Sequence, residues 1–186
     1  MKKILLAAAL TALTTSAFAA DLKPYVEGSV GYMGIDDLKG NNHVDPKWTS
    51  KVDSDVTYGI EAGLKDILLP GLRLSISDDY VNAKVKSDDT SIISVNIYQA
   101  NAYYDFKTSS AFTPYVGVGI GGYKNNRVRD HELAASIKAG VNYNFNQNVY
   151  AGLKATYFYF DDSKGGQSDI ESLNAYSLNA VLGYQF

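Results

Sequence analysis

The chain has 186 residues, no cysteine, a formal net charge of −3 and 46% hydrophobic residues. The lack of cysteine excludes a disulfide framework, a thiolate metal site and a cysteine-linked lipid anchor. Fifteen Tyr, seven Phe and sixteen Gly against four Pro are typical of a β-rich chain with tight turns, and the length predicts one domain.

The N-terminus has the pattern of a secretory signal peptide. Two lysines directly after the first methionine precede an apolar run, and Ala17 and Ala19 are the small residues that a signal peptidase reads. The apolar run is too short for a membrane helix, and no later run approaches the roughly 18 apolar residues that one requires. We therefore predict a signal peptide over residues 1–19 and a single mature domain over residues 20–186.

After the signal peptide, eight segments alternate between apolar residues and small or polar ones. A period of two is the side-chain period of a β-strand. The connections after the second, fourth and sixth segments are short, while the others are longer and more polar, as in outer-membrane barrels with short periplasmic turns. The expected strands are 25–33, 56–65, 72–79, 98–106, 112–123, 133–145, 149–159 and 174–186, and the expected external loops are 34–53, 84–91, 124–131 and 161–172.

Two segments lose their alternation. The phase of the third strand fails at Asp78, so its membrane part is expected to end there or to be interrupted by a β-bulge. Upstream of the fourth strand, Ile93, Val95 and Ile97 have the parity opposite to that of the apolar face. This predicts a second phase change near Ile97.

The last segment distinguishes a membrane barrel from a soluble one. Every second residue back from Phe186 is apolar, with aromatic residues at both ends of the strand and aliphatic residues between them. Amphipathic rings favour the two membrane interfaces, whereas a soluble barrel such as a lipocalin would place its large apolar side chains inside. The aromatic brackets and the glycine-rich opposite face favour an all-β, eight-stranded antiparallel up-and-down transmembrane β-barrel.

Three motifs resemble the small outer-membrane β-barrel superfamily, which includes opacity-type, OmpA-like and OmpX-like barrels. They are residues 101–106 (NAYYDF), 113–121 (TPYVGVGIG) and 182–186 (LGYQF). The resemblance covers the mature chain and implies a Gram-negative outer membrane and insertion by the barrel-assembly machinery, with Phe186 in the assembly signal. It implies roles such as adhesion, serum resistance, envelope integrity or minor porin activity. The chain departs from the full OmpA pattern, because no peptidoglycan-binding domain follows Phe186.

Several charged residues fall on the inward face of the expected barrel. The interior of an eight-stranded barrel is about wide enough for side chains to fill, so long side chains from opposite walls can meet, and unpaired charges there are badly solvated. We predict a plug rather than a pore, and the alternative is a narrow porin-like channel for small solutes. The expected network joins Glu27 and Glu61 to Lys138 and Lys154, with Arg73 and Asp105 as a second candidate pair at the periplasmic end.

The loops suggest surface partners. Lys124, Arg127 and Arg129 in the third external loop are candidates to pair with lipopolysaccharide phosphates, and a solvated basic loop is the alternative. Trp48 in the first loop could anchor a partner or fold onto its own loop. Outer-membrane lipid and host or cell-surface ligands are thus the expected partners, and no nucleic acid is expected.

A membrane-embedded hydrolase is the enzymatic alternative. It needs a nucleophile or activated water with a base in hydrogen-bond reach. The two histidines are His43, in the first loop, and His131, which has outward parity while Ser136 faces inward. The acidic doublets near the external rim could hold a divalent cation or could simply be solvated. We predict no catalytic residue, no metal site and no cofactor.

Overall fold

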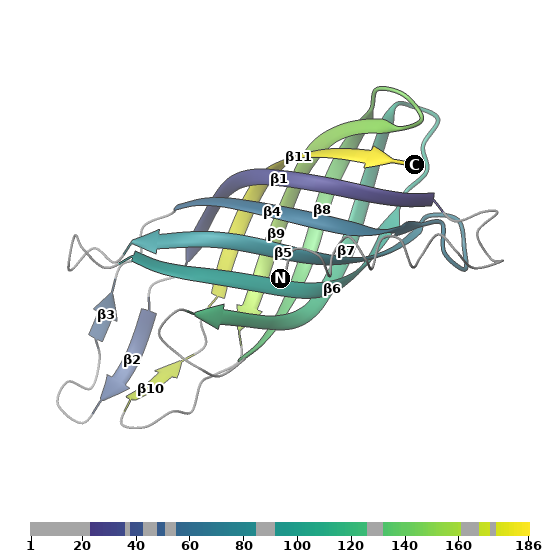
Figure 1. Ribbon diagram of the computed structural model, residues 1–186. Helices are drawn as coiled ribbons and strands as arrows, with labels where there is room; N and C mark the ends of the chain where they lie inside the picture. The colour runs from purple at the N-terminus through teal and green to yellow at the C-terminus, as the bar shows by residue number, and fades with distance from the viewer. Residues whose placement is uncertain are drawn as a thin grey trace, which may run out of the picture.

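Figure 1 shows the computed structural model, a closed antiparallel barrel with a small separate sheet at one end. The structure describes residues 23–35, 38–42, 48–50, 55–84, 92–125, 132–160, 168–171 and 174–186. The predicted signal peptide lies outside these ranges. Within them, the chain forms no helix with the length and hydrophobicity that a membrane-crossing helix requires.

Eight strands form the barrel, which confirms the predicted fold class. Each pairs with its neighbours along the chain in antiparallel register, and the first barrel strand closes the ring by pairing with the last from Tyr25↔Gln185 to Ile35↔Ala175. The strands are β1 (Lys23–Ile35), β4 (Asp55–Lys65), β5 (Leu72–Lys84), β6 (Ile92–Asp105), β7 (Phe112–Asn125), β8 (Glu132–Asn144), β9 (Val149–Phe160) and β11 (Asn174–Gln185).

Three short strands lie outside the barrel, in segments that were expected to be loops. β2 (Leu38–Asn42) pairs with β3 (Trp48–Ser50) on one edge and with β10 (Ser168–Glu171) on the other. Figure 1 shows this sheet at the end opposite the C-terminus. The segments meet because β1 and β11, the strands from which they extend, are neighbours in the barrel. Such pairing joins residues far apart in sequence, so local alternation does not indicate it.

The bulge considered at Asp78 in β5 and the phase change expected near Ile97 in β6 are wrong, whereas the end of the membrane part of β5 near Asp78 stays a prediction. The two strands pair without interruption from Leu72↔Tyr104 to Lys84↔Ile92, so no bulge interrupts them. Ile97 keeps the inward parity of its strand and is only 1% exposed, while Asp78 keeps the outward parity of β5. The side chains of both strands alternate regularly between inward and outward. The inward residues are polar along most of the barrel and become apolar near the long-loop end.

The outward face carries the large apolar side chains, as expected. Aliphatic residues such as Ile137, Leu153 and Leu178 are more than half exposed, between two sets of exposed aromatic residues. Near the short turns these aromatic residues are Tyr104, Phe106, Phe112, Tyr143, Phe145, Tyr184 and Phe186, and near the long loops they are Tyr32, Tyr58, Tyr98, Tyr157, Tyr159 and Tyr176.

One short turn is organised around Asp66. Its carboxylate accepts from Lys23 Nζ at 2.8 Å and from the Gly71 N–H at 2.8 Å, and lies 2.9 Å from Lys107 Nζ. Partial burial alone would raise the pKa of Asp66, but the hydrogen bonds from Lys23, Gly71 and Lys107 lower it well below its ordinary value. The contacts tie the start of β1 to the turns after β4 and β6.

Candidate functional site: the barrel interior

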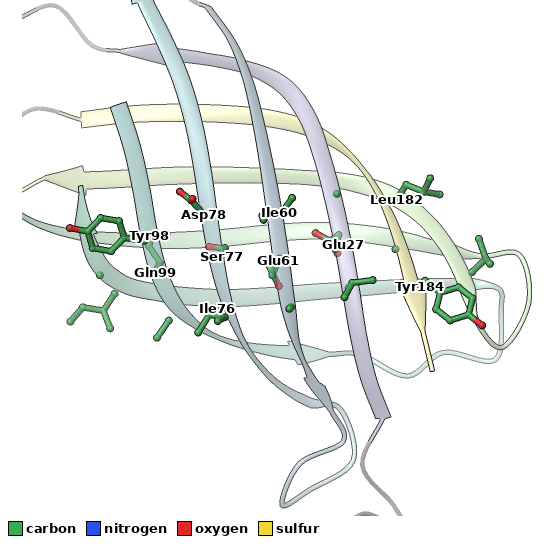
Figure 2. A pocket seen from close by; sticks show the side chains of 18 residues that line it. Glu27, Ile60, Glu61, Ile76, Ser77, Asp78, Tyr98, Gln99, Leu182 and Tyr184 are labelled. Carbon is green, nitrogen blue, oxygen red and sulfur yellow. The ribbon is translucent and has the colours of Figure 1, made fainter. Parts of the chain in front are cut away.

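Two buried glutamates form the centre of the interior. Glu27 on β1 and Glu61 on β4 are Cα partners across the strand pair, and each is only 4% exposed (Figure 2). Like charges directly opposite each other on neighbouring strands are destabilising, so the pair requires cations. Lys154 on β9 supplies one: its Nζ lies 2.8 Å from Glu27 Oε1 and 3.3 Å from Glu61 Oε2.

Hydroxyl groups saturate the remaining carboxylate oxygens. Glu61 accepts hydrogen bonds from Tyr25 at 2.5 Å, from Ser75 at 2.9 Å and from Tyr103 at 2.9 Å. The hydroxyl of Tyr150 donates to Glu27 at 3.2 Å. The sequence reasoning missed these tyrosines, although their inward parity in otherwise small or polar faces was a signal that could have found them.

Arg73 lies below the glutamates, towards the short-turn end. It is 1% exposed, and its Nη1 lies 3.8 Å from Glu27 Oε2 and 3.9 Å from Glu61 Oε1. Its Nη2 lies 3.2 Å from Asp105 Oδ1. The guanidinium also rests 4.2 Å from the ring centre of Tyr103, a cation–π arrangement that favours a desolvated Arg. Arg73 therefore joins the expected second pair to the first network.

Lys138 lies in the interior but differs from its predicted pairing. Its Nζ donates to Asn101 Oδ1 at 2.6 Å, rather than to a glutamate. Asn101 in turn donates to Ser75 at 3.3 Å, and Ser75 donates to Glu61. The reason is crowding, since Lys154 and three hydroxyls already surround Glu61. Lys138 is thus linked to the carboxylate only through a chain of neutral side chains.

The inward-facing charges balance. Among the residues whose side chains the structure describes, four acidic and four basic side chains line the interior, and Asp55 and Lys23, with inward parity at the two rims, add one charge of each sign. Lys65 belongs to this set, because its Nζ lies 4.0 Å from the ring centre of Tyr150. The acids are Glu27, Glu61, Asp79 and Asp105, and the bases are Lys65, Arg73, Lys138 and Lys154.

Glycines opposite the rings make this packing possible. A Cβ on Gly117 would lie 2.2 Å from the ring of Tyr103, and one on Gly183 would lie 2.1 Å from the ring of Tyr150. Both distances are far below contact, so a methyl group at either position would displace a ring. Tyr103 and Asn101 thus occupy the space beside Gly117 and Gly119 of β7.

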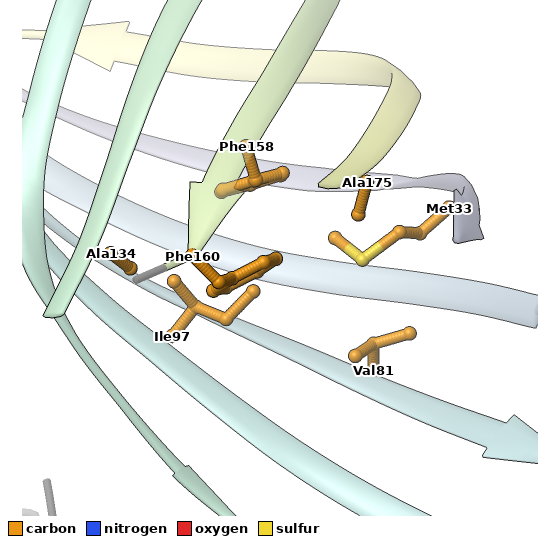
Figure 3. Packing of buried hydrophobic residues seen from close by; sticks show 7 residues of the cluster. All are labelled: Met33, Val81, Ile97, Ala134, Phe158, Phe160 and Ala175. Carbon is orange, nitrogen blue, oxygen red and sulfur yellow. The ribbon is translucent and has the colours of Figure 1, made fainter. Parts of the chain in front are cut away.

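An apolar cluster fills the interior at the long-loop end. Phe158 and Phe160 of β9 stack with ring centres 6.0 Å apart, and Tyr123 meets Phe160 edge-on at 4.9 Å. Figure 3 shows the cluster members converging from several strands. We call this set the outer apolar cluster: Met33, Val81, Ile97, Ala134, Phe158, Phe160 and Ala175. The sequence reasoning missed it, because the barrel was expected to be apolar on its outward face alone.

The remaining candidates lie at the ends of the barrel. Lys124 is exposed near the outer end of β7, and Phe186 is exposed beyond β11, where its N–H donates to Pro24 O at 2.9 Å. Arg127, Arg129, His43, His131 and the side chain of Trp48 lie outside the described part of the chain. No group of residues that could hold a metal ion occurs among the described residues.

Solved structures with this fold are outer-membrane barrels. Neisserial surface protein A (NspA) superposes with a TM-score of 0.61 at 19% identity, over 88% of this chain and 97% of that one. OprG from Pseudomonas aeruginosa gives 0.58 at 15% identity, over 88% and 95%. The outer membrane enzyme PagL gives 0.52 at 16% identity, over 84% and 97%, so the fold alone does not decide whether a barrel is an enzyme. No curated protein matches the sequence.

The family assignment comes from the sequence itself. The outer membrane protein beta-barrel domain matches residues 5–186, almost the whole chain. This confirms the resemblance to small outer-membrane barrels and agrees with the closed eight-stranded fold. The chain therefore belongs to the outer membrane protein beta-barrel family, and it resides in the bacterial outer membrane.

Proposed function

We propose that this protein is a closed barrel with a structural or surface-interaction role, in adhesion or envelope integrity, and that it conducts no solutes. The packing of the barrel interior supports this proposal. The ion-pair network around Glu61 and Arg73 spans the short-turn half, and the outer apolar cluster spans the long-loop half. Two independent obstructions in series oppose a continuous column of water.

Each obstruction has its own physical basis. Freeing Lys154 or Arg73 from the glutamates would leave charges desolvated without partners, which is strongly unfavourable. Hydrophobic constrictions such as the one around Phe158 and Phe160 close pores by excluding water. The balance of inward charges also leaves no excess of one sign to attract a permeating ion.

The sheet of β2, β3 and β10 supports a role at the cell surface. Outer-membrane barrels place short turns in the periplasm and longer loops outside, so this sheet would project from the cell. Outer-membrane lipid and lipopolysaccharide are expected to surround the barrel, with Lys124, Arg127 and Arg129 as candidate phosphate contacts. Host or cell-surface ligands are candidate partners of the external sheet.

We further propose that the barrel is not an enzyme. Within the described interior, the buried hydroxyl of Ser75 donates to Glu61 and that of Ser136 donates to Gln99. A hydrolase needs a nucleophile with a base in hydrogen-bond reach and also access for its substrate. Ser75 and Glu61 are both buried, and the carboxylate is already paired with Lys154. Purified protein should therefore release no fatty acid from lipid A or phospholipid and should cleave no peptide. Turnover that is lost in a His131→Ala variant would contradict this.

A narrow channel is the alternative, and one observation favours it. Tyr115, Asn142, Ser177 and Asn179 each carry a buried polar atom without a protein partner. Buried polar groups of this kind normally bind water, so the middle of the barrel is the region where a water path would begin. The two obstructions would have to move for that path to reach both ends.

Export and assembly can be tested separately. Residues 1–19 are proposed to be removed, so the mass of the mature protein should correspond to a chain that begins at Ala20. Phe186 is proposed to act in the signal for the barrel-assembly machinery. Its replacement by Ser should lower the amount inserted in cells, while the purified variant should still refold in detergent. Failure in both settings would instead indicate a structural role.

A deletion strain tests the proposed function. It should lose adhesion to host cells or resistance to detergent, while uptake of small solutes stays unchanged. Complementation with a variant in which a short turn replaces residues 38–50 should restore detergent resistance and leave adhesion impaired. Reduced solute uptake with intact adhesion and detergent resistance would support the channel instead.

A further inference from the structure

The outer wall of the barrel contains an apolar groove of about 1080 Å³. It crosses the strands, because its outward lining residues form two adjacent rows of Cα partners. In one row Ala62, Ile76 and Ala100 succeed one another on β4, β5 and β6. In the next row Ile60 and Asp78 follow one another on β4 and β5, and Tyr98 continues the row on β6 (Figure 2). Ala62 and Ala100 have smaller side chains than their neighbours, so they form the floor of the groove.

The carboxylate of Asp78 lies at the side of this groove nearer the long loops. Asp78 is the one acidic side chain on the described outward face of the barrel strands, and the amide of Asn96 lies 3.4 Å from its Oδ1. Asn96 is the Cα partner of Lys124 on β7, which is exposed. An acceptor and an amide therefore lie together beside the apolar floor, and Lys124 lies directly across from Asn96 on the next strand. We call Asp78, Asn96 and Lys124 the wall triad.

The depth of the wall triad indicates which part of a lipid it could contact. A charged side chain that faces the membrane is unfavourable to a degree that grows with depth. Tyr98 and Tyr58 mark this level as the interface near the long loops, where polar headgroups meet acyl chains. An occupant that pairs with the triad and fills the groove would carry hydrogen-bond donors and negative charge at one end and an acyl chain at the other.

We propose that this wall binds one lipopolysaccharide molecule of the outer leaflet. Its phosphate pairs with Lys124, its hydroxyl or amide N–H groups donate to Asp78 and Asn96, and one acyl chain lies in the groove over Ala62 and Ala100. The long-loop end faces the leaflet that is built of this lipid. The proposal adds a specific lipid site to the proposed surface role and does not depend on whether the interior is closed.

A second groove on the wall provides the control. It has a volume of about 660 Å³ and is lined outward by apolar and aromatic side chains from β5 to β9, among them Val118, Ala139 and Ala155. No charged side chain on its lining faces outward, because Lys138 is buried inside the barrel. Acyl chains can lie there, but no headgroup contact holds one lipid in preference to another.

Native mass spectrometry of the refolded barrel tests the site. The probes are lipid A, phosphatidylethanolamine and phosphatidylglycerol, each with EDTA present so that metal bridges do not contribute. Wild type should retain one lipid A. Lys124→Gln, Asp78→Leu and the groove-filling Ala100→Phe should each lower its retention about tenfold, the effect expected for losing one charge-assisted contact or the acyl seat. Ala139→Phe in the second groove should have no effect.

Two outcomes of the variant experiments would overturn the proposal. One is equal retention of lipid A by wild type and the Ala100→Phe variant. The other is stronger retention after Asp78→Leu, since that would show that the carboxylate repels the headgroup. Folding is checked by the shift in gel mobility on heating. Asp78→Leu should also raise barrel stability in vesicles without lipid A, because it removes a charge that faces lipid. Tighter binding of phosphatidylglycerol than of lipid A would assign the wall to a phospholipid and contradict the proposal.

Discussion

Replacing Glu61 by Ala is the sharpest test of the interior network. The carboxylate accepts from Tyr25, Tyr103 and Ser75, and it shares Lys154 with Glu27. Its loss leaves three buried hydroxyls without their acceptor. Removing one partner from a buried charged group costs about 3–5 kcal/mol, and each unsatisfied buried donor up to about 1–3 kcal/mol before the structure relaxes.

We therefore expect Glu61→Ala to lower the free energy of unfolding by about 3–5 kcal/mol. The cost is no larger because Lys154 and Arg73 remain paired with Glu27, and because relaxation restores part of the hydrogen bonding. The assay is reversible urea unfolding in lipid vesicles, followed by tryptophan fluorescence and gel mobility. Glu61→Gln, which keeps an acceptor and loses the charge, should fall between the variant and wild type. Asp55→Ala at the rim is the control and should stay within about 0.5 kcal/mol. A change that small in Glu61→Ala would refute the network as a source of stability.

Three further predictions concern the wall, the topology and the turn. Ile137 is 63% exposed on the lipid face. Its replacement by Arg should lower the free energy of unfolding by roughly 2–4 kcal/mol in the same assay. Cysteine at Asn42 should react with a membrane-impermeant thiol reagent on intact cells, whereas cysteine at Ser109 should not. Asp66→Asn should lower stability at neutral pH by up to about 1 kcal/mol. Because the folded pKa of Asp66 lies below its unfolded value, its contribution is complete at neutral pH and is lost as the pH falls below about 4.

Each of these has a result that contradicts it. A silent Ile137→Arg together with a Lys138→Ile variant that fails to fold would reverse the inside and outside of β8. Labelling at Ser109 but not at Asn42 would invert the barrel in the membrane. A wild-type advantage over Asp66→Asn that grows as the pH falls through 4 would have the wrong sign for a carboxylate with a lowered pKa.

The architecture could be predicted from the sequence because each lipid-facing strand must be apolar at every second position. The alternation around Ile137 and Leu178 fixed the inward and outward faces, and the same parity put Glu27, Glu61 and Lys154 inside. In a barrel this narrow, opposite walls are within reach of long side chains, so the approach of Lys154 to the glutamates followed from geometry alone.

Features that depend on tertiary neighbours could not be predicted in this way. Whether Lys138 meets a glutamate or Asn101 depends on how many groups already surround Glu61, which periodicity does not report. The inward Ile97 looked like a phase change because an apolar residue was assumed to face lipid. The pairing of β2 with β10 joins segments more than a hundred residues apart, and neither has an alternating pattern of its own.

The central claim is that the interior is closed, and planar-bilayer recording of the purified wild type tests it most directly. Lys154 held between Glu27 and Glu61, and the phenylalanines of the outer apolar cluster, predict little or no steady conductance. Glu61→Ala should conduct little more than wild type as long as the outer apolar cluster stays in place, because it loosens only one of the two obstructions. A large, stable and ion-selective conductance in the wild type would contradict the closed interior and establish the barrel as a channel.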